Sequence, residues 1–89
     1  MDFNSLLKLV VHKQASDLFI TAGVPPSLKV NGKIKPISQT PLTSDQARDT
    51  VFGVMTPAQR EEFETRHECN FAISAPGLGR FRVSAFMQR

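Results

Sequence analysis

Apolar and polar residues alternate most regularly in residues 79–86 (GRFRVSAF). A period of two is typical of a half-buried β-strand, because successive side chains point to opposite faces of a sheet. The apolar face would consist of Phe81, Val83 and Ala85, and the other face of Arg80, Arg82, Ser84 and Phe86. The two arginines would then lie roughly 6–7 Å apart on one rigid element, which suits binding of a phosphate or carboxylate group.

A helical period appears at the other end of the chain, where apolar residues recur at positions i, i+3, i+4, i+7 and i+8. The residues of this stripe are Phe3, Leu6, Leu7, Val10 and Val11. The stripe predicts a helix that packs on the core. Asp2 is placed to cap its start, and His12 and Lys13 suit its C-terminal end.

Two further helices are predicted from capping boxes, in which a threonine precedes a glutamine by three residues. Thr43 and Gln46 begin the first of these helices. Thr56 and Gln59 begin the second, with a proline at its first helical position. We expect the second helix to run to about Arg66.

The remaining apolar stretches predict four more strands, separated by segments rich in glycine and proline. These strands would span residues 17–21, 27–30, 33–37 and 70–75. Residues 76–79 (PGLG) would turn the fourth of them into the strand at 79–86. An odd number of turn residues is expected there, because only that spacing brings the two apolar faces together.

Asn31 and Gly32 join two of these strands and form a strong hairpin signal. A two-residue turn would place Lys33 opposite Val30, so that lysines and apolar residues share a face. We therefore expect an odd-length, bulged turn with Gly32 at a positive φ. Pro36 has no N–H to donate, so the following strand should fray or lie at a sheet edge.

The predicted order is one helix, three strands, two helices and two strands, without a βαβ repeat. This order predicts an α+β fold, in which a mostly antiparallel sheet has helices packed on one face. The 89 residues are enough for one domain, residues 1–89, with a modest core. We expect extra burial against a neighbouring domain or subunit, and we expect the chain to be part of a longer protein.

The net charge of +3 comes from eleven basic and eight acidic residues that are interleaved along the chain. Nucleic-acid binding would favour a dense basic stripe with stacking aromatic residues, and Tyr and Trp are absent, so we expect no nucleic-acid partner. The single cysteine, Cys69, fits a reducing compartment. We find no secretory signal pattern and no apolar run near ~20 residues, and we therefore expect a cytoplasmic protein.

Sequence patterns of catalytic and metal sites are missing from the chain. It has no G-x-x-x-x-G-K-[ST] sequence, and the glycines of residues 77–80 join two strands and predict a hairpin turn. His67 and Cys69 are two apart without a second pair at ligand spacing. The glutamates of the third helix predict a solvated face. We therefore predict no catalytic residue, no metal ligand and no cofactor for this chain alone.

Arg80, Arg82 and Phe86 remain as candidate binding residues, and two interpretations are open. The arginines could form surface ion pairs, which contribute little, with Glu61, Glu64 or Glu68. Alternatively they face a partner, which Phe86 favours, because a large aromatic residue beside two arginines is typical of an interface. Asp17 is expected only to cap or turn the backbone at the start of a strand.

Several stretches together resemble the N-terminal domain of the PilT/PilU motor ATPases of type IV pili, within the wider secretion-ATPase family. These are SDLFITAGVPPS at 16–27, VNGKI at 30–34, VFGVMTPAQREEF at 51–63 and GRFRVSAFMQR at 79–89. The similarity covers nearly the whole chain. It is closer to the PilU branch, because PilT-like chains usually have S-D-L-H where residues 16–19 are S-D-L-F. The opening MDFNSLL is also PilU-like.

The resemblance implies a PAS-like fold, followed in the parent protein by a RecA-like domain that binds ATP and Mg²⁺. It also implies a hexameric ring, in which this domain packs on the ATPase domain of the next subunit. Motion between the domains would drive pilus retraction in twitching motility. The implied partners are the chain's own C-terminal ATPase domain, neighbouring subunits, a PilT-like motor and the pilus inner-membrane platform protein. The implied location is the cytoplasmic base of the pilus machine at the inner membrane.

The resemblance further implies a role for the arginines, because family arginines at the end of this domain can reach the nucleotide. Arg80 and Arg82 match the family's R-x-R-V-S pattern, and Arg82 is the stronger candidate for neutralising phosphate charge. Arg82→Ala should then slow ATP turnover in the parent protein with little effect on folding. The chain alone should not hydrolyse ATP. The alternative is a freestanding PAS-like module that binds a small anionic ligand or nucleic acid.

Overall fold

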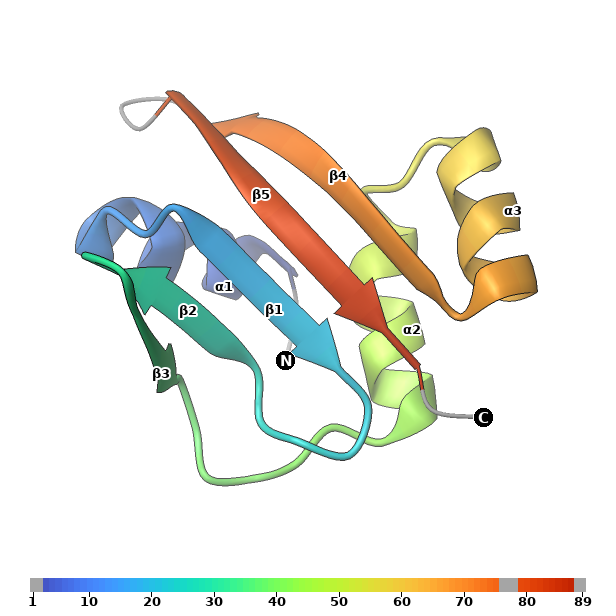
Figure 1. Ribbon diagram of the computed structural model, residues 1–89, viewed down its shortest axis with the longest axis horizontal. Coiled ribbons are helices and arrows are strands. Elements are labelled where there is room, and N and C mark those ends of the chain that lie inside the picture. Colours follow the sequence, from blue (N-terminus) through green and yellow to red (C-terminus); the bar gives the residue numbers. More distant parts are fainter. Residues whose placement is uncertain (1–2, 76–78, 88–89) are drawn as a thin grey trace.

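The computed structural model describes residues 3–75 and 79–87, with residue 75 described by its backbone alone. Three helices and five strands follow one another in the predicted order (Figure 1). The helices are α1 (Phe3–Lys13), α2 (Ser44–Phe52) and α3 (Pro57–Arg66). The strands are β1 (Asp17–Thr21), β2 (Ser27–Val30), β3 (Lys33–Pro36), β4 (Glu68–Ala75) and β5 (Gly79–Phe86).

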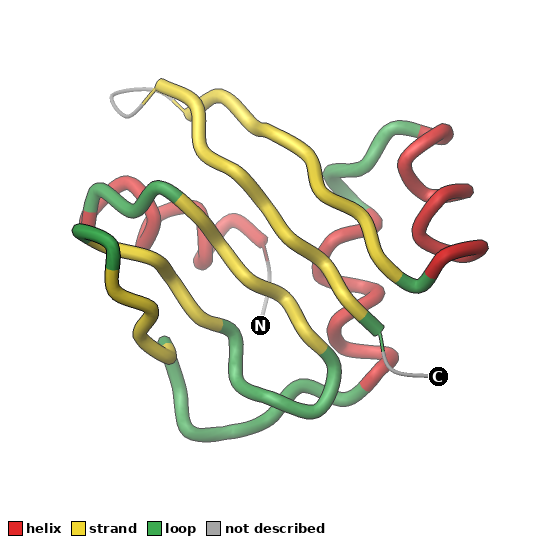
Figure 2. The backbone as a smooth tube through the Cα atoms, in the orientation of Figure 1, coloured by secondary structure: helices red, strands yellow, loops and turns green. Residues whose placement is uncertain are grey.

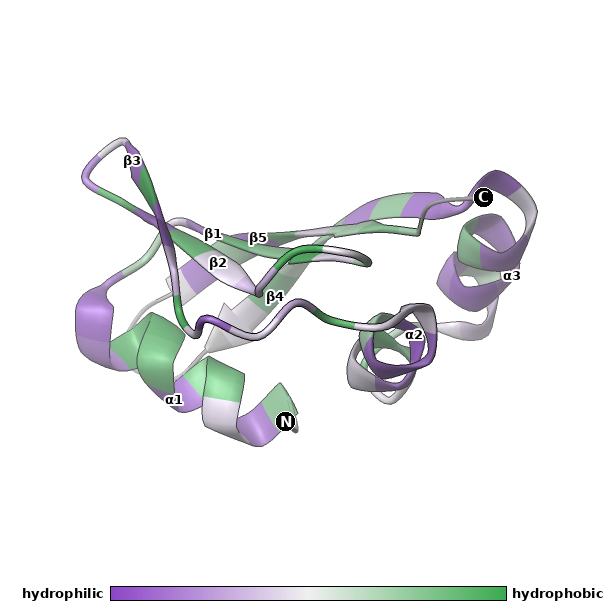
Figure 3. Ribbon diagram, turned by 90° about the horizontal axis from the view of Figure 1, so that it is seen from below, coloured by the Kyte–Doolittle hydropathy of each residue, from purple (hydrophilic) through white to green (hydrophobic). Residues whose placement is uncertain are grey.

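All five strands form one sheet with the order β3-β2-β1-β5-β4. Neighbouring strands are antiparallel except β1 and β5, which run parallel and join the N-terminal strands to the C-terminal hairpin. Helices α1 and α2 lie against one face of the sheet, and α3 lies beside the β4 edge (Figures 1 and 3). The predicted α+β fold with a mostly antiparallel sheet is confirmed. The closer assignment to a PAS-like fold stays a prediction.

The core lies between the sheet and the helices, and each element contributes the apolar stripe expected from its period. Among its buried residues are Leu6, Val10, Leu18, Ile20, Ala47, Val51, Phe63, Phe81, Val83 and Ala85. The alternation predicted for β5 is therefore confirmed. Burying one Val, Leu, Ile or Phe side chain stabilises the fold by about 1.5–3 kcal/mol, so this cluster supplies most of the favourable free energy.

Both predicted capping boxes are present. The side-chain oxygen of Thr43 accepts a hydrogen bond from the backbone N–H of Gln46 at 3.1 Å, and Thr43 N–H donates to Gln46 Oε1 at 2.9 Å. Thr56 and Gln59 repeat this pattern at 3.2 Å and 2.9 Å. These bonds satisfy backbone donors at the starts of α2 and α3, and each cap contributes about 1 kcal/mol. The predicted cap of α1, Asp2, lies outside the described residues.

The long connection from β3 to α2 crosses the end of the sheet beside the loop between β1 and β2 (Figure 2). Two backbone hydrogen bonds hold it there, from Gly23 N–H to the Leu42 carbonyl oxygen at 2.7 Å and from Leu42 N–H to the Val24 carbonyl oxygen at 3.0 Å. Leu42 is buried. These two hydrogen bonds and the buried Leu42 position the connection so that α2 begins on the helix-covered face of the sheet.

The prediction for the Asn31-Gly32 turn is wrong in its length. Val30 lies opposite Lys33, and Asn31 and Gly32 have φ values of 51° and 79°, as in a two-residue type I′ turn. The positive φ of Gly32 is confirmed. The expected conflict between lysines and apolar residues costs little, because all four residues of β3 are exposed and its lysines reach water. The edge position predicted from Pro36 is confirmed.

The register of the C-terminal hairpin agrees with its prediction. Ala75 lies opposite Gly79, which leaves an odd number of residues, 76–78, between the paired positions. The turn predicted at these three residues lies outside the described residues. Gly79 has a φ of 88°, a conformation that glycine adopts without steric cost.

Two helices end at residues other than glycine with a left-handed backbone. After α1, Gln14 has a φ of 55°, and the N–H of Ala15 donates to the Val10 carbonyl oxygen at 3.0 Å. After α3, His67 has a φ of 62°, and its N–H donates to the Phe63 carbonyl oxygen at 2.8 Å. A side chain with a Cβ atom disfavours this conformation by about 1–2 kcal/mol. The Nδ1 atom of His67 is also buried without a hydrogen-bond partner among the described residues.

Replacing His67 with glycine should stabilise the 89-residue chain by about 1 kcal/mol, because glycine accepts the left-handed backbone and the unsatisfied Nδ1 disappears. For a domain of this size the melting temperature should rise by about 4–8 °C. Thr65→Gly, in the last turn of α3, is the matched control and should destabilise by about 1 kcal/mol. A lower melting temperature for His67→Gly would contradict this account of the helix end.

Candidate functional site

One face of the sheet is covered by no helix in the described part of the chain, and we call it the open face. Its side chains alternate with the buried ones and include every candidate residue predicted from the sequence, Arg80, Arg82 and Phe86. The strand register aligns one residue from each strand in a row across the sheet. This row consists of Ile34, Lys29, Asp17, Arg82 and Ala72.

Asp17 and Arg82 form an ion pair at the centre of this row. Arg82 Nε lies 2.8 Å from Asp17 Oδ1. The hydroxyl group of Ser16 donates to the other carboxylate oxygen, Oδ2, at 2.7 Å. The Asp17 side chain is 6% exposed, whereas the Arg82 side chain is 72% exposed. The carboxylate is therefore fixed through both of its oxygens, while most of the guanidinium stays accessible from solvent.

The surroundings of Asp17 keep its carboxylate ionised. Burial alone would raise its pKa, but the hydrogen bond from Ser16, the hydrogen bond and charge of Arg82 and the charge of Lys29 together lower the pKa below its ordinary value. A buried carboxylate is strongly unfavourable unless it is paired and hydrogen-bonded. Arg82 and Ser16 meet this requirement at the start of β1.

The ion pairs suggested by the sequence are not the ones that form. Arg82 pairs with Asp17, and Glu64 pairs with Arg48 at 2.8 Å. Arg80 is exposed and has no ion pair among the described residues. The role expected for Asp17, capping or turning the backbone, understates its function. Sequence reasoning could not find this pair, because it depends on the register between two strands that are far apart in the chain.

Apolar side chains flank the charged centre of the open face. Phe86 is 43% exposed at the end of β5, and Ile34 is 61% exposed on β3. The sequence prediction missed Ile34 because it assigned the wrong register to the hairpin. A shallow hollow of about 670 Å³ lies at the charged centre, and its lining includes Asp17, Lys29 and Arg82. Exposed large apolar side chains beside charged groups favour contact with a partner.

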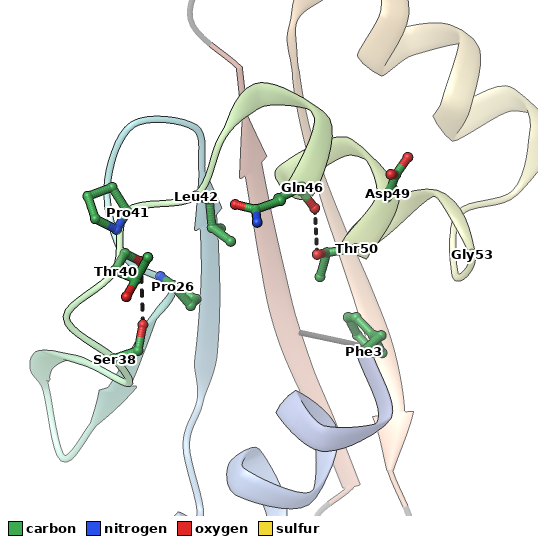
Figure 4. Close-up of a pocket in the computed structure, with 10 residues that line it drawn as sticks. All are labelled: Phe3, Pro26, Ser38, Thr40, Pro41, Leu42, Gln46, Asp49, Thr50 and Gly53. Carbon is green, nitrogen blue, oxygen red and sulfur yellow. Dashed lines mark hydrogen bonds between the residues drawn. The ribbon is translucent and has the colours of Figure 1, made fainter.

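A second hollow of about 700 Å³ lies between α1, the β3–α2 connection and α2 (Figure 4). Its polar side chains make local hydrogen bonds: Thr50 Oγ1 donates to the Gln46 carbonyl oxygen at 2.6 Å, and Ser38 Oγ to the Thr40 carbonyl oxygen at 3.4 Å. Among the described residues that line it, Asp49 alone is charged. This hollow therefore gathers no set of convergent polar groups, and the open face is the better candidate site.

The other groups considered from the sequence form no site. The residues that the structure describes contain no cluster of three or more His, Cys, Asp or Glu side chains able to hold a metal ion. Cys69 is buried, and burial together with the neighbouring Glu62 carboxylate raises the pKa of its thiol to about 11. The thiol stays protonated and unreactive at neutral pH. Within the described ranges, each helix is too short or too polar to cross a bilayer.

Asp17→Asn should destabilise the 89-residue chain by about 1–3 kcal/mol at pH 7, because it removes a charged hydrogen-bond acceptor. Since the pKa of Asp17 is lowered in the folded state, its carboxylate stabilises the fold above the unfolded-state pKa of about 3.9. That contribution is lost as the pH falls toward the folded-state pKa. Urea unfolding should therefore show a gap between wild type and variant at pH 7 that narrows at about pH 3.

Asp49→Asn is the matched control, because Asp49 is exposed on α2. Its effect should stay within about 0.5 kcal/mol at both pH values. A gap for Asp17→Asn that is equally large at both pH values would show that the carboxylate charge is not what stabilises the fold.

Comparison with known proteins places these features in a family. No family model matches the chain. It is 64% identical over all 89 residues to the type IV pilus ATPase PilU of Pseudomonas aeruginosa. It is 39% identical over 88 residues to the type IV pilus retraction ATPase PilT of the same organism and 28% identical over 82 residues to a twitching motility protein of Neisseria gonorrhoeae. The chain spans 23%, 26% and 22% of the lengths of these three relatives.

The fold comparison agrees with the sequence comparison. The whole chain matches 26% of a crystal structure of the pilus retraction motor PilT with bound ADP, with a TM-score of 0.74 and 30% identity. The matching part is the N-terminal domain of PilT. In sequence and fold the chain therefore corresponds to the N-terminal domain of the PilT/PilU family of type IV pilus ATPases, and PilU is the more similar of the two in sequence.

Proposed function

We propose that the chain is the N-terminal interaction and regulatory domain of a hexameric ATPase that powers type IV pilus retraction in twitching motility. The observation that carries this proposal is the 64% identity to PilU over the whole chain. The fold match to a PilT structure with bound ADP supports it. In the parent protein a separate domain would bind ATP and Mg²⁺ and hydrolyse the ATP. This domain would supply binding surfaces.

The open face is the surface that would pack on an ATPase domain. Phe86 and Ile34 expose apolar area on this face, whereas the opposite face is covered by α1 and α2 (Figure 3). Large exposed apolar side chains beside charged groups favour a protein partner over free solvent. The partner would be the ATPase domain of the neighbouring subunit in the ring, and packing there would help to close the nucleotide cleft.

Arg82 is the residue most suited to face a nucleotide at such a contact. Its Nε binds Asp17, and its side chain is 72% exposed. An exposed guanidinium can bind phosphate oxygens in a bidentate manner. Arg80 lies two residues away on the same face and is exposed, so it can add a second positive charge. Both arginines would neutralise charge that develops on the phosphates during hydrolysis.

The wider assembly follows from the same proposal. Besides the chain's own ATPase domain and neighbouring subunits, the partners would include a PilT-like motor and the pilus inner-membrane platform protein. The site of action would be cytoplasmic, at the inner-membrane base of the pilus machine. The open face has acidic as well as basic residues, Asp17 and Glu68 among them, so nucleic acid is not expected as a partner.

Arg82→Gln in the full-length motor tests the nucleotide role. The variant should lower the ATP turnover number on the order of 10–100-fold, because it removes a positive charge from the phosphates. Glutamine is a better replacement than alanine, since its amide N–H can still donate to the Asp17 carboxylate, which is only 6% exposed. Arg82→Ala would leave that carboxylate without its charged partner, so an effect on folding is expected, contrary to the prediction from sequence.

Arg66→Gln is the control for Arg82→Gln, because Arg66 is an exposed arginine at the end of α3. It should retain full turnover. The melting temperatures of both variants should stay within a few degrees of wild type. An unchanged turnover number in Arg82→Gln would rule out the proposed contact with the nucleotide.

The double variant Ile34→Ser/Phe86→Ser tests the packing surface. In the 89-residue chain these exposed positions should affect stability by no more than about 0.5 kcal/mol each. In the full-length motor, loss of their burial should raise the protein concentration needed for subunit assembly by about 10-fold or more. Sedimentation velocity measures this concentration. Val54→Ser, which changes an exposed valine between α2 and α3, should leave assembly unchanged. Normal assembly of the double variant would exclude this face as the subunit contact.

A further inference from the structure

The Asp17 carboxylate is unusual because it is buried on a face that is otherwise open to solvent. The Asp17 side chain is 6% exposed, whereas of its neighbours in the row across the sheet Lys29 is half-buried and Arg82 is exposed. Placing an ionised group there costs free energy unless strong partners compensate for the lost hydration. A fold that only required strand pairing at this position would be served by an uncharged residue. The presence of a carboxylate therefore indicates a role beyond the pairing of β1 with its neighbours.

The backbone fixes where this carboxylate lies relative to Arg82. Asp17 and Arg82 are register partners in the parallel pair β1–β5. The N–H of Arg82 donates to the carbonyl oxygen of Ser16 at 3.0 Å, directly before Asp17. The Ser16 hydroxyl group then holds Oδ2 at 2.7 Å, which leaves Oδ1 to face the guanidinium. The position of the carboxylate is thus set by the strands and by Ser16, independently of the arginine side chain.

The contact between Arg82 and Asp17 runs through Nε of the guanidinium. A guanidinium has five N–H donors, and the one on Nε is directed at Oδ1 over 2.8 Å. The Arg82 side chain is 72% exposed, so the guanidinium can also be reached from solvent. An arginine held through Nε loses the rotamer freedom of its long side chain before any ligand arrives. Its remaining donors are then organised in advance for a planar, bidentate contact.

The local charge also permits an anion to bind beside the pair. Asp17, Lys29 and Arg82 line the same hollow, so two positive charges face one negative charge. The Asp17 carboxylate neutralises one of the two positive charges, and a net positive charge remains to attract a ligand. A phosphate group could therefore bind to the Nη atoms without displacing the carboxylate.

We infer that Asp17 is a positioning residue for Arg82, which it holds through Nε so that the two Nη groups are presented to the nucleotide phosphates. The inference rests on the proposed function, because it assumes that Arg82 faces nucleotide in the parent motor. Asp17 itself touches no nucleotide in this account. Its effect on catalysis passes entirely through Arg82.

A double-mutant cycle in the full-length motor tests this inference. Asp17→Asn should lower the turnover number by about 3–10-fold with little change in KM for ATP, because it loosens Arg82 without removing it. In the Arg82→Gln background the same substitution should cause no further loss, since Asp17 acts only through that arginine. The affinity of Asp17→Asn for a fluorescent ATP analogue, measured without turnover, should change little.

The control separates positioning from simple destabilisation. Val51→Ala removes buried methyl groups of α2 and weakens the fold without touching Arg82. It should leave the turnover number unchanged at a temperature where the motor is folded. Ser16→Ala is the second variant, for use if Asp17→Asn fails to fold, and it should produce a smaller loss of the same kind. Asp17→Glu keeps the charge and should retain more activity than Asp17→Asn.

Each outcome decides between the two proposals. If Arg82→Gln slows turnover while Asp17→Asn and Ser16→Ala do not, Asp17 only joins the strands, and the positioning role is wrong although the proposed function stands. If the losses from Asp17→Asn and Arg82→Gln add, Asp17 acts independently of Arg82, and the positioning role is again wrong. If Arg82→Gln leaves turnover unchanged, the nucleotide role of Arg82 fails, and the positioning role fails with it.

Discussion

The parallel pairing of β1 with β5 is the constraint on which the rest of the structure depends. It is the only strand pairing between the N-terminal strands and the C-terminal hairpin in the described sheet. On the covered face it brings Leu18 beside Val83 and Ile20 beside Ala85, all buried. On the open face the same register brings Asp17 beside Arg82. One set of backbone hydrogen bonds therefore positions both the centre of the core and the candidate site.

Burial has opposite effects on the two faces of this strand pair. On the covered face, burial of apolar side chains stabilises the fold and sets the register, because a shift of one residue would exchange the faces. On the open face, the same register brings a buried carboxylate to its partner, and the ion pair compensates for a desolvation cost that would otherwise destabilise β1. The site is thus built on the same two strands as the core beneath it, and regular strands position side chains more precisely than loops do.

Much of the fold could be predicted from local patterns in the sequence. The alternation in β5 and the capping boxes at Thr43 and Thr56 each depend on residues close together in the chain, and the structure confirms them. The hairpin at Asn31-Gly32 departs from the prediction because the chemistry of the turn, and not the matching of apolar faces, sets its register. At an exposed edge strand the turn decides the register, since lysines on either face can reach water.

Only some residues of the candidate site can be predicted from the sequence. Arg80, Arg82 and Phe86 could be found because they alternate with buried residues within one strand. Asp17 and Ile34 could not, because their places on the open face depend on the parallel register and on the turn length respectively. Neither the parallel register nor the turn length could be predicted from the alternation of residues within one strand. The resemblance to motor ATPases indicated which end of the chain matters, but the structure was needed to show what holds the arginine.

The central claim is that the open face meets an ATPase domain and that Arg82 reaches its nucleotide while still bound to Asp17. The most direct test is a structure of the full-length motor with a non-hydrolysable ATP analogue. The account predicts that a neighbouring ATPase domain covers Phe86 and Ile34. It also predicts that Nε of Arg82 stays on Asp17 while an Nη atom lies within about 3 Å of a phosphate oxygen. An open face left in solvent, with Arg82 far from the nucleotide, would contradict it.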